Sequence, residues 1–219
     1  MVRAEFENKL RELHGDIIEM GGCVEAAIRD SIRAFTSHDV DLCKAIIQND
    51  EVIDEMEKQI ESKCLWMIAR EQPIASDLRN ITTALKITTD MERIGDHAED
   101  IADVAMRLAD KNAFADSSHI PQMAAAAVEM VHSALEAYVN CDLALAKSTE
   151  EKDDIVDDLF NVIKEELVQI FSSEPQHIDS AIDFLMIAKY LERIADHAVN
   201  ICEWVHFSKT GVHKNRQIF

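Results

Sequence analysis

Apolar residues recur along most of the chain with alternating spacings of three and four, the pattern of an amphipathic helix. The clearest stripe begins at Ile87, Met91 and Ile94, and a second one begins at Ile187 and Leu191. Breaks in the pattern are few, because the 219 residues include only five glycines and three prolines. The pattern therefore predicts an all-α fold of long helices that pack along their lengths.

Turn signals divide the chain at comparable points in its two halves. Asp39 and Asp142 each follow a short polar stretch and suit the N-cap of the next helix. Pro73 and Pro175 mark a second break in each half, because proline ends one helix and is tolerated in the first turn of the next. We expect three helices in each half, at residues 3–36, 39–70, 74–110, 120–140, 142–171 and 176–207.

The third predicted helix of each half carries the same motif. Residues 91–98 read MERIGDHA, and residues 191–198 read LERIADHA. An internal repeat of this length indicates two copies of one fold rather than a solenoid. We therefore expect six long helices in two tandem, homologous three-helix bundles. Repeat 1 is predicted at 1–112 and repeat 2 at 118–208, and a short C-terminal tail follows at 209–219. The linker is predicted from Asn112 to Pro121, so it overlaps the end of repeat 1 and the start of repeat 2.

The excess of acidic residues argues against nucleic acid as a partner. The formal charge is −20, from 42 acidic and 22 basic residues, and it would repel the phosphate backbone that dominates nucleic-acid affinity. We therefore expect no nucleic-acid partner. No segment approaches the ~20 apolar residues of a membrane helix, and the N-terminal segment does not resemble a secretory signal. These features predict a cytoplasmic protein without membrane insertion.

Cysteine usage and the C-terminal tail agree with that prediction. The five cysteines are odd in number and include no Cys-x-x-Cys pair, so we expect them to be reduced, buried and apolar in character. The tail is locally basic at Lys209, Lys214 and Arg216, and we interpret it as a solvated chain end.

A second stripe, made of oxygen-bearing side chains, lies almost opposite the apolar stripe on the third helix of each half. Like charges four residues apart destabilise an isolated helix, so the stripe needs compensation. In a chain this acidic a solvated surface remains an alternative, because single acidic pairs arise often by chance. The stripes consist of Glu92, Asp96, Asp100 and Asp103 and their counterparts Glu192, Asp196, Asn200 and Glu203.

Duplication of acidic pairs in the second helices favours a metal site over the solvated surface. Asp50 and Asp54 recur as Asp153 and Asp157, so each half has a pair on its second helix and a pair on its third. Carboxylate oxygens suit hard cations such as Mg²⁺, Ca²⁺, Mn²⁺ and ferric iron, and added imidazole would widen the choice to Zn²⁺ or Fe. Such a cluster requires the second and third helices to lie side by side.

Histidine and arginine flank the acidic stripes. His97 and His197 directly follow the motif aspartate, and each is a candidate ligand, a partner of a ligand or a histidine satisfied at the core boundary. Arg93 and Arg193 either pair with acids of a neighbouring helix, which we favour, or belong to an anion-responsive surface.

The duplicated ERIGDHA and ERIADHA motifs, each preceded by Asp-x-x-x-Asp in the second helix, resemble the signature of the PhoU family over essentially the whole chain. The resemblance implies two three-helix bundles packed end to end, with metal ions or clusters (Fe, Zn, Mn or Mg) on their outer surface. By motif position, it implies one site at Asp50, Asp54, Glu92 and Asp96 and another at Asp153, Asp157, Glu192 and Asp196. Asn200 stands where the first repeat has Asp100 and lacks its negative charge, which predicts that the two sites bind a cation with unequal affinity.

The resemblance also implies a role. Proteins similar to this chain in these motifs are non-enzymatic homodimers that assist a phosphate ABC transporter and its sensor histidine kinase. They repress the phosphate-starvation response and restrain uptake when phosphate is plentiful. The resemblance therefore implies two partners for this chain, the transporter ATPase and the phosphate-sensing histidine kinase, besides a second copy of itself.

Two other functions stay open from the residues alone. One is a carboxylate-bridged di-iron enzyme on a helical bundle, for which Glu-x-x-His is the ligand motif. The motif is found at Glu129/His132, Glu174/His177 and Glu203/His206, but these pairs are not related by the internal repeat. The other is a purely structural interaction protein whose acids bind no ion.

Overall fold

Long helices dominate the computed structural model, which describes residues 2–109, 119–173, 175–214 and 216–217. The all-α class and the two repeated three-helix bundles are confirmed. The α-helices are α1 (Val2–Ser37), α2 (Val40–Glu71), α3 (Ser76–Ala109), α4 (His119–Asn140), α5 (Leu143–Glu150), α6 (Asp153–Ser173) and α7 (Ile178–Thr210). A short 3-10 helix, η1 (Pro175–His177), precedes α7, and an antiparallel hairpin of β1 (Val212–His213) and β2 (Arg216–Gln217) follows it.

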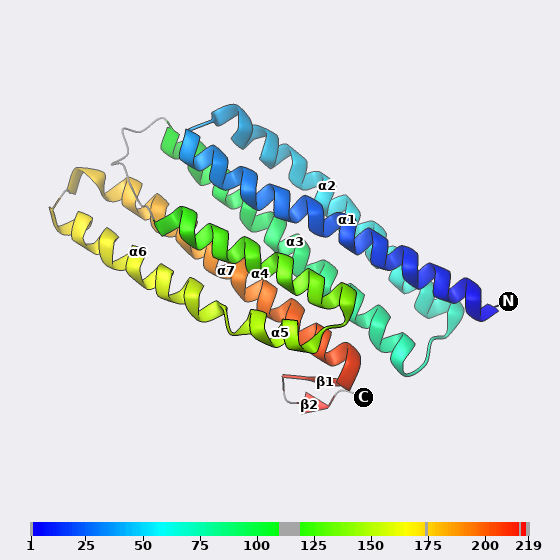
Figure 1. Ribbon diagram of the computed structural model, residues 1–219. Coiled ribbons are helices and arrows are strands. Elements are labelled where there is room, and N and C mark those ends of the chain that lie inside the picture. Colours follow the sequence, from blue (N-terminus) through cyan, green and yellow to red (C-terminus); the bar gives the residue numbers. More distant parts are fainter. Residues whose placement is uncertain (1, 110–118, 174, 215, 218–219) are drawn as a thin grey trace.

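The two bundles lie side by side, so the expected end-to-end packing is wrong. Helices α3 and α7 run antiparallel and make the most extensive contact between any two elements, and α1 also touches α4 (Figure 1). The physical reason is length. A helix of 34 residues is about 50 Å long, and alignment along that length buries far more surface than contact at its tip.

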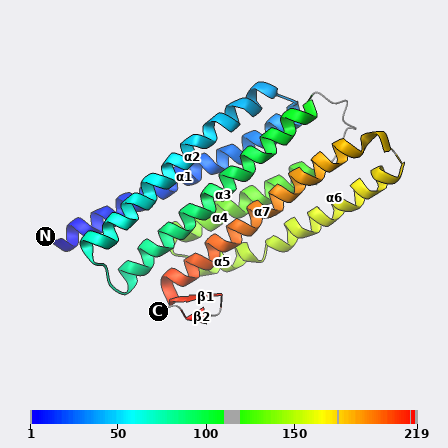
Figure 2. The ribbon, with the colours of Figure 1, turned by 180° about the vertical axis from the view of Figure 1, so that it is seen from behind.

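The helices form two layers. Figure 2 shows α2, α3, α7 and α6 side by side on one broad face, with α1 and α4 behind them. Each bundle core lies between the layers, where the apolar stripes of α3 and α7 meet α1 and α4. Met91, Ile94, Leu191 and Ile194 are all fully buried. The opposite sides of α3 and α7 are thereby left to the broad face.

The predicted N-caps are confirmed. Asp39 accepts a hydrogen bond from the backbone N–H of Leu42 at 3.0 Å, and Asp142 accepts one from that of Leu145 at 3.0 Å. In each half the chain turns just before the cap through a left-handed residue, His38 or Cys141. The repeat therefore extends to its loops.

One expected helix is split in two. The segment predicted as 142–171 breaks after α5, and Asp153 becomes the first residue of α6. A buried threonine, Thr149, stands where the first repeat has Ile46, and its hydroxyl donates to the carbonyl of Leu145 at 2.9 Å. The backbone N–H of Lys152 then donates to the carbonyl of Thr149 at 3.0 Å, in a turn that separates α5 from α6. Thr88 makes the same kind of hydroxyl bond within the unbroken α3, so the hydroxyl of Thr149 alone does not explain the break.

Several smaller expectations need adjustment. Cys43, Cys64 and Cys202 are buried as expected, but Cys23 is only partly buried and Cys141 is exposed in the turn before α5. All five are free thiols, and burial raises the pKa of Cys64 and Cys202 to about 12.

The C-terminal tail is not simply solvated. In its described part, the ring of His213 stacks on Trp204 with the centroids 3.8 Å apart, and Lys214 pairs with Glu203 at 3.0 Å. The predicted linker falls mostly at 112–118, outside the described residues. None of the helices in the described ranges combines the length and apolar character that a membrane crossing requires.

The central isoleucine of the first motif offers a test of the core. Ile94 is fully buried, so Ile94→Ala should lower the free energy of unfolding by about 2–5 kcal/mol in a urea titration. Ile18→Ala is the matched control, because Ile18 is 51% exposed and its loss should cost less than about 0.5 kcal/mol. Equal effects would mean that α3 does not bury this face.

Candidate metal centre

A groove between α2 and α3 brings together carboxylates from both helices, and we call it the first groove. Asp50, Asp54 and Asp96 form its centre, where one oxygen from each lies within 4.8 Å of the others. All three side chains are partly buried. The first groove consists of Asp50, Asp54 and Glu57 from α2 and Glu92, Asp96 and Glu99 from α3.

Local geometry explains why these acids meet. Asp50 and Asp54 are one helical turn apart, as are Glu92 and Asp96, so each pair points to one side of its helix. Ile53 is buried between the two α2 aspartates and packs beside Gly95 of α3. Core packing of α2 on α3 therefore forces the two acidic pairs towards each other.

Crowding changes the protonation of these acids. Burial, followed by the negative charges of Glu99 and Asp96, raises the pKa of Asp50 to about 6. Burial, followed by the charge of Asp96, raises the pKa of Glu92 to about 7. Burial also raises the pKa of Glu57 and Glu99. A bound cation would relieve both causes, since it replaces lost hydration and offsets the repulsion.

Two cationic side chains partly neutralise the first groove. Arg93 lies 2.8 Å from Asp96 and 3.3 Å from Glu92, and Lys58 lies 3.9 Å from Asp54. Arg93 thus pairs with acids of its own helix, so the expectation that it pairs with a neighbouring helix is wrong. Its side chain is long enough to fold back along α3 towards acids one and three residues away.

One oxygen of the first groove has no hydrogen-bond partner among the described residues. Glu92 Oε2 is buried and makes no hydrogen bond to this part of the chain, although Arg93 Nε lies 3.3 Å away. An unpaired buried carboxylate oxygen is costly, and a hard cation is the kind of ligand that would satisfy it. The donor set is made of carboxylate oxygens, so the residues present fit Mg²⁺, Mn²⁺ or ferric iron.

The corresponding second groove lies between α6 and α7 and is more open. It consists of Asp153, Asp157, Glu192 and Asp196. Burial and the charges of Asp157 and Asp196 raise the pKa of Asp153 to about 6. Asp153 Oδ1 is buried, and no residue that the structure describes forms a hydrogen bond with it. Asp157 and Asp196 are exposed, and Lys189 hydrogen-bonds Glu192. Among the described residues, no trio as close as that of the first groove forms here.

Both motif histidines point into the contact between α3 and α7, which we call the α3–α7 seam. His97 stacks on Tyr190 with the centroids 5.6 Å apart, and His197 Nδ1 lies 2.8 Å from Asp90 Oδ1. The two imidazoles are themselves 5.8 Å apart. Burial lowers the pKa of His97. The two histidines thus pack between the bundles and do not belong to the close carboxylate trio.

The other candidate ligands also have partners outside the grooves. Asp100 lies 3.4 Å from His97, and Asn200 donates to Asp90 at 3.3 Å. Asp103 pairs with Arg107, and Glu203 pairs with Lys214 of the C-terminal hairpin. None of these four residues belongs to the close trio of Asp50, Asp54 and Asp96.

Sequence reasoning did not single out four residues of this region. Glu57 and Glu99 follow Asp54 and Asp96 by three residues, the spacing that keeps side chains on one face of a helix, so this signal was available. Asp90 and Tyr190 occupy the same position in the two repeats, but they differ in chemistry. Their role depends on contacts between α3 and α7, and such contacts cannot be predicted from a local sequence pattern.

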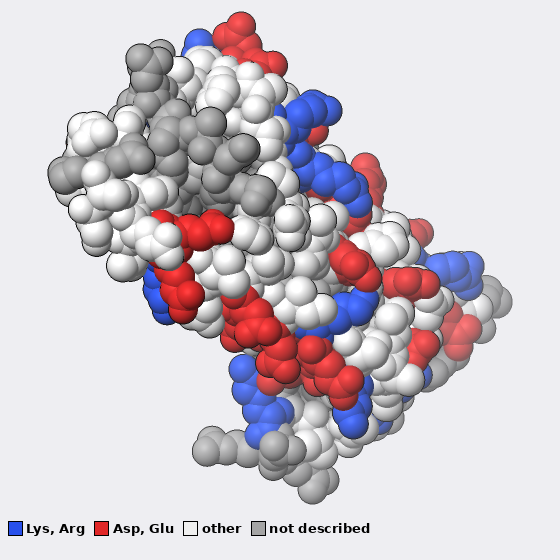
Figure 3. Space-filling model, turned by 60° about the vertical axis from the view of Figure 1, so that its left-hand side comes forward, with Lys and Arg blue, Asp and Glu red and all other residues white. Residues whose placement is uncertain are grey.

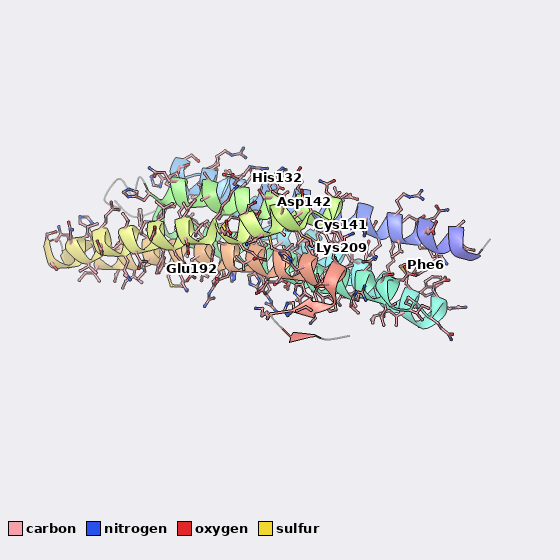
Figure 4. The ribbon with its side chains drawn as sticks, turned by 60° about the horizontal axis from the view of Figure 1, so that its bottom comes forward. Phe6, His132, Cys141, Asp142, Glu192 and Lys209 are labelled. Atoms are coloured by element: carbon pink, nitrogen blue, oxygen red, sulfur yellow. The ribbon has the colours of Figure 1, made fainter. Side chains whose placement is uncertain are left out.

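In the layer of the broad face, α2 lies next to α3 and α6 lies next to α7, so the two grooves flank the α3–α7 seam (Figure 2). Figure 4 shows Glu192 of α7 on this side and His132 of α4 on the opposite side of the molecule. Acidic side chains are not confined to the grooves: on the face drawn in Figure 3 they form a nearly continuous run across the lower half, with a few Lys and Arg beside it.

The Glu-x-x-His pairs do not join either groove. His132 lies 2.9 Å from Glu25 of α1, and Glu129 pairs with Lys152 at 2.6 Å. His206 lies 3.7 Å from Glu150. Glu174 lies outside the described residues. The described pairs therefore lack the shared inward-facing site that a di-iron bundle uses.

Comparison with known proteins agrees with this geometry. The model of the PhoU domain matches the chain twice, at residues 17–105 and 120–205. A Phosphate-specific transport system accessory protein PhoU homolog from Clostridium acetobutylicum is 40% identical over 212 residues, which cover 96% of this chain and 97% of that protein. A protein of the same description from Caulobacter vibrioides is 35% identical and covers 94% of this chain and 90% of its own length.

Solved structures agree as well. The crystal structure of PhoU from Pseudomonas aeruginosa superposes with a TM-score of 0.91 at 32% identity, covering 94% of this chain and 100% of that chain. The phosphate transport system regulatory protein PhoU from Streptococcus pneumoniae gives a TM-score of 0.90 at 28% identity, covering 95% and 98%. Two matched domains, relatives over nearly the full length and the same fold lead to one conclusion: this chain belongs to the PhoU family.

Proposed function

We propose that this chain is a metal-binding, non-enzymatic regulator of phosphate uptake and of the phosphate-starvation response. The observation that carries the transport role is its 40% identity, over 96% of its length, to a protein described as an accessory of phosphate-specific transport. Regulation would proceed by contact with other proteins, namely the ATPase of a phosphate ABC transporter and a phosphate-sensing histidine kinase. The chain would act as a homodimer in the cytoplasm.

The carboxylate trio supports the metal part of the proposal. Asp50, Asp54 and Asp96 would hold the cation in the first groove, with Glu92 beside them. In the second groove Asp153, Asp157, Glu192 and Asp196 would do so. The cation would supply positive charge between carboxylates that otherwise repel one another.

The shape of the molecule supports the partner part. The four helices of the broad face run side by side, and a well-packed core lies directly beneath them. A rigid face keeps its charges in place when a partner docks, which lowers the entropic cost of association. Cation occupancy of the grooves would set the charge of this face and, with it, the affinity for a partner.

Metal binding can be tested with Mn²⁺, whose free concentration is measurable by electron paramagnetic resonance. Chelator-treated protein should bind Mn²⁺ saturably, and Asp54→Asn/Asp96→Asn should remove the share bound by the first groove. Asp41→Asn/Glu136→Gln is the matched control, because both side chains are exposed and outside the grooves. Binding that is absent from the wild type, or unchanged in the groove variant, would contradict the proposed site.

Stability of the metal-free protein should depend on Glu92 in a pH-dependent way. The pKa of Glu92 is raised from 4.5 to about 7 in the folded chain, so its favourable contribution is full below about pH 4.5 and is lost as pH rises through 7. Glu92→Gln should therefore unfold at a higher temperature than wild type at about pH 8, and at a similar temperature at about pH 4.5. About 1 kcal/mol corresponds to roughly 2–4 °C for a chain of this size.

A thermal melt monitored by circular dichroism measures this difference. The control is Glu136→Gln, an exposed residue of α4, which should follow the wild type at both pH values. Saturating Mn²⁺ should raise the melting temperature of wild type at about pH 8 by more than that of Glu92→Gln, since a ligand stabilises the state that binds it. Parallel pH profiles of wild type and Glu92→Gln would contradict the crowding of the first groove.

Partner binding is tested by co-purification. The full chain, immobilised with Mn²⁺, should retain the transporter ATPase and the histidine kinase encoded in the same genome, with retention that differs between high and low phosphate. Asp54→Asn/Asp96→Asn should retain less of both partners. Retention of neither partner would remove the regulatory proposal.

A further inference from the structure

The two motifs differ at a position that faces the carboxylates. Gly95 of α3 corresponds to Ala195 of α7. A Cβ placed on Gly95 would lie 3.1 Å from Ile53 Cγ2, 3.2 Å from Ile53 Cδ1 and 3.2 Å from Asp50 Oδ1. These distances are shorter than ordinary carbon contacts, so a side chain at position 95 would force Ile53 and Asp50 to move away by a few tenths of an ångström.

The glycine is not needed for the backbone of α3. It lies inside a continuous α-helix, its φ is not positive, and glycine in a helix interior costs about 1 kcal/mol relative to alanine. A residue that weakens its own helix is explained here by the close approach of Ile53 and Asp50. The gain is geometric, since Asp50 reaches the oxygens of Asp54 and Asp96.

The corresponding pair of side chains in the second repeat has the same total number of carbon atoms, but they are divided differently between the two helices. Val156 stands where the first repeat has Ile53, and Ala195 stands where it has Gly95. One carbon is thus removed from the second helix and one is added to the third, so the total volume is conserved, as core substitutions tolerate best. The added methyl of Ala195 is fully buried. Ala195 stands in α7 at the position that corresponds to Gly95 in α3.

The acids of the two grooves also differ in solvent exposure. Asp54 and Asp96 are partly buried, whereas their counterparts Asp157 and Asp196 are exposed. The first groove has a trio of oxygens within 4.8 Å of one another. In the described residues of the second groove no such trio forms, although all four acids are present.

We propose that Gly95 is a positioning residue that makes the first groove the tighter cation site, and that Ala195 makes the second groove the weaker one. This inference rests on the proposed metal binding and adds an order of filling to it. At low cation concentration the first groove fills alone, and at higher concentration both fill. The chain therefore presents three charge states on its broad face rather than two.

Exchange of the two packing pairs tests the inference. Each groove is first isolated in the full chain, with Asp157→Asn/Asp196→Asn leaving the first and Asp54→Asn/Asp96→Asn leaving the second. Ile53→Val/Gly95→Ala is then added to the first-groove protein, and Val156→Ile/Ala195→Gly to the second-groove protein. Mn²⁺ dissociation constants are measured by electron paramagnetic resonance, and metal-free melting temperatures verify folding.

The expected result is a reciprocal change. The isolated first groove should bind Mn²⁺ more tightly than the second, and Ile53→Val/Gly95→Ala should weaken it about tenfold or more, the effect typical of lost ligand positioning. Val156→Ile/Ala195→Gly should tighten the second groove. Ile53→Val alone is the control, since it removes a carbon but leaves Gly95 in place, and should change affinity much less.

The outcomes separate the two proposals. If neither isolated groove binds Mn²⁺, both the proposed metal binding and this inference fail. If both grooves bind and the exchanges leave both affinities unchanged, metal binding stands and the role of Gly95 is overturned. If Ile53→Val/Gly95→Ala does not fold, the second-groove exchange decides alone, because a gain of affinity there cannot result from damage to the fold.

Discussion

The antiparallel contact between α3 and α7 is the constraint on which the rest of the molecule depends. Each of these helices has three sides with different tasks: an apolar stripe faces its own bundle, a polar and aromatic side forms the α3–α7 seam, and an acidic side faces α2 or α6. Because the two helices align along their whole length, the bundles lie side by side, and the four helices that carry the acidic grooves form one broad face (Figure 2). End-to-end packing would have separated the grooves by the length of a bundle.

Core packing overcomes the repulsion of the acids. Full burial of a side chain such as Met91 or Ile94 contributes about 1.5–3 kcal/mol, while a pair of like charges one turn apart costs about 0.2–0.5 kcal/mol on an exposed helix. The core can therefore hold Asp50 close to Asp96. The cost that remains appears as the raised pKa of Asp50 and Glu92. A bound cation would relieve this cost.

Duplication supplies two grooves, and small substitutions make them different. Gly95 and Ile53 in one repeat correspond to Ala195 and Val156 in the other, a change that conserves volume but moves one carbon from the second helix to the third. Lys189 also hydrogen-bonds Glu192, whereas Arg93 interacts with both Glu92 and Asp96. Two copies of one fold thus have distinct electrostatic surroundings at their acidic pairs.

The sequence alone determined the helices, most of their ends, the internal repeat and the two acidic pairs of each half, because apolar periodicity, N-caps and prolines act over a few residues. It also carried the family resemblance through its two motifs. Only the tertiary structure decided that the bundles align side by side, that His97 and His197 belong to the seam, and that Asp50, Asp54 and Asp96 meet while their counterparts do not. These outcomes depend on contacts between residues far apart in the sequence, such as Asp50 with Asp96 and Asp90 with His197, which are 107 positions apart. They also depend on the space that one missing Cβ leaves between two helices. Local patterns specify which side of a helix is apolar or charged, but packing selects the neighbour that each side meets.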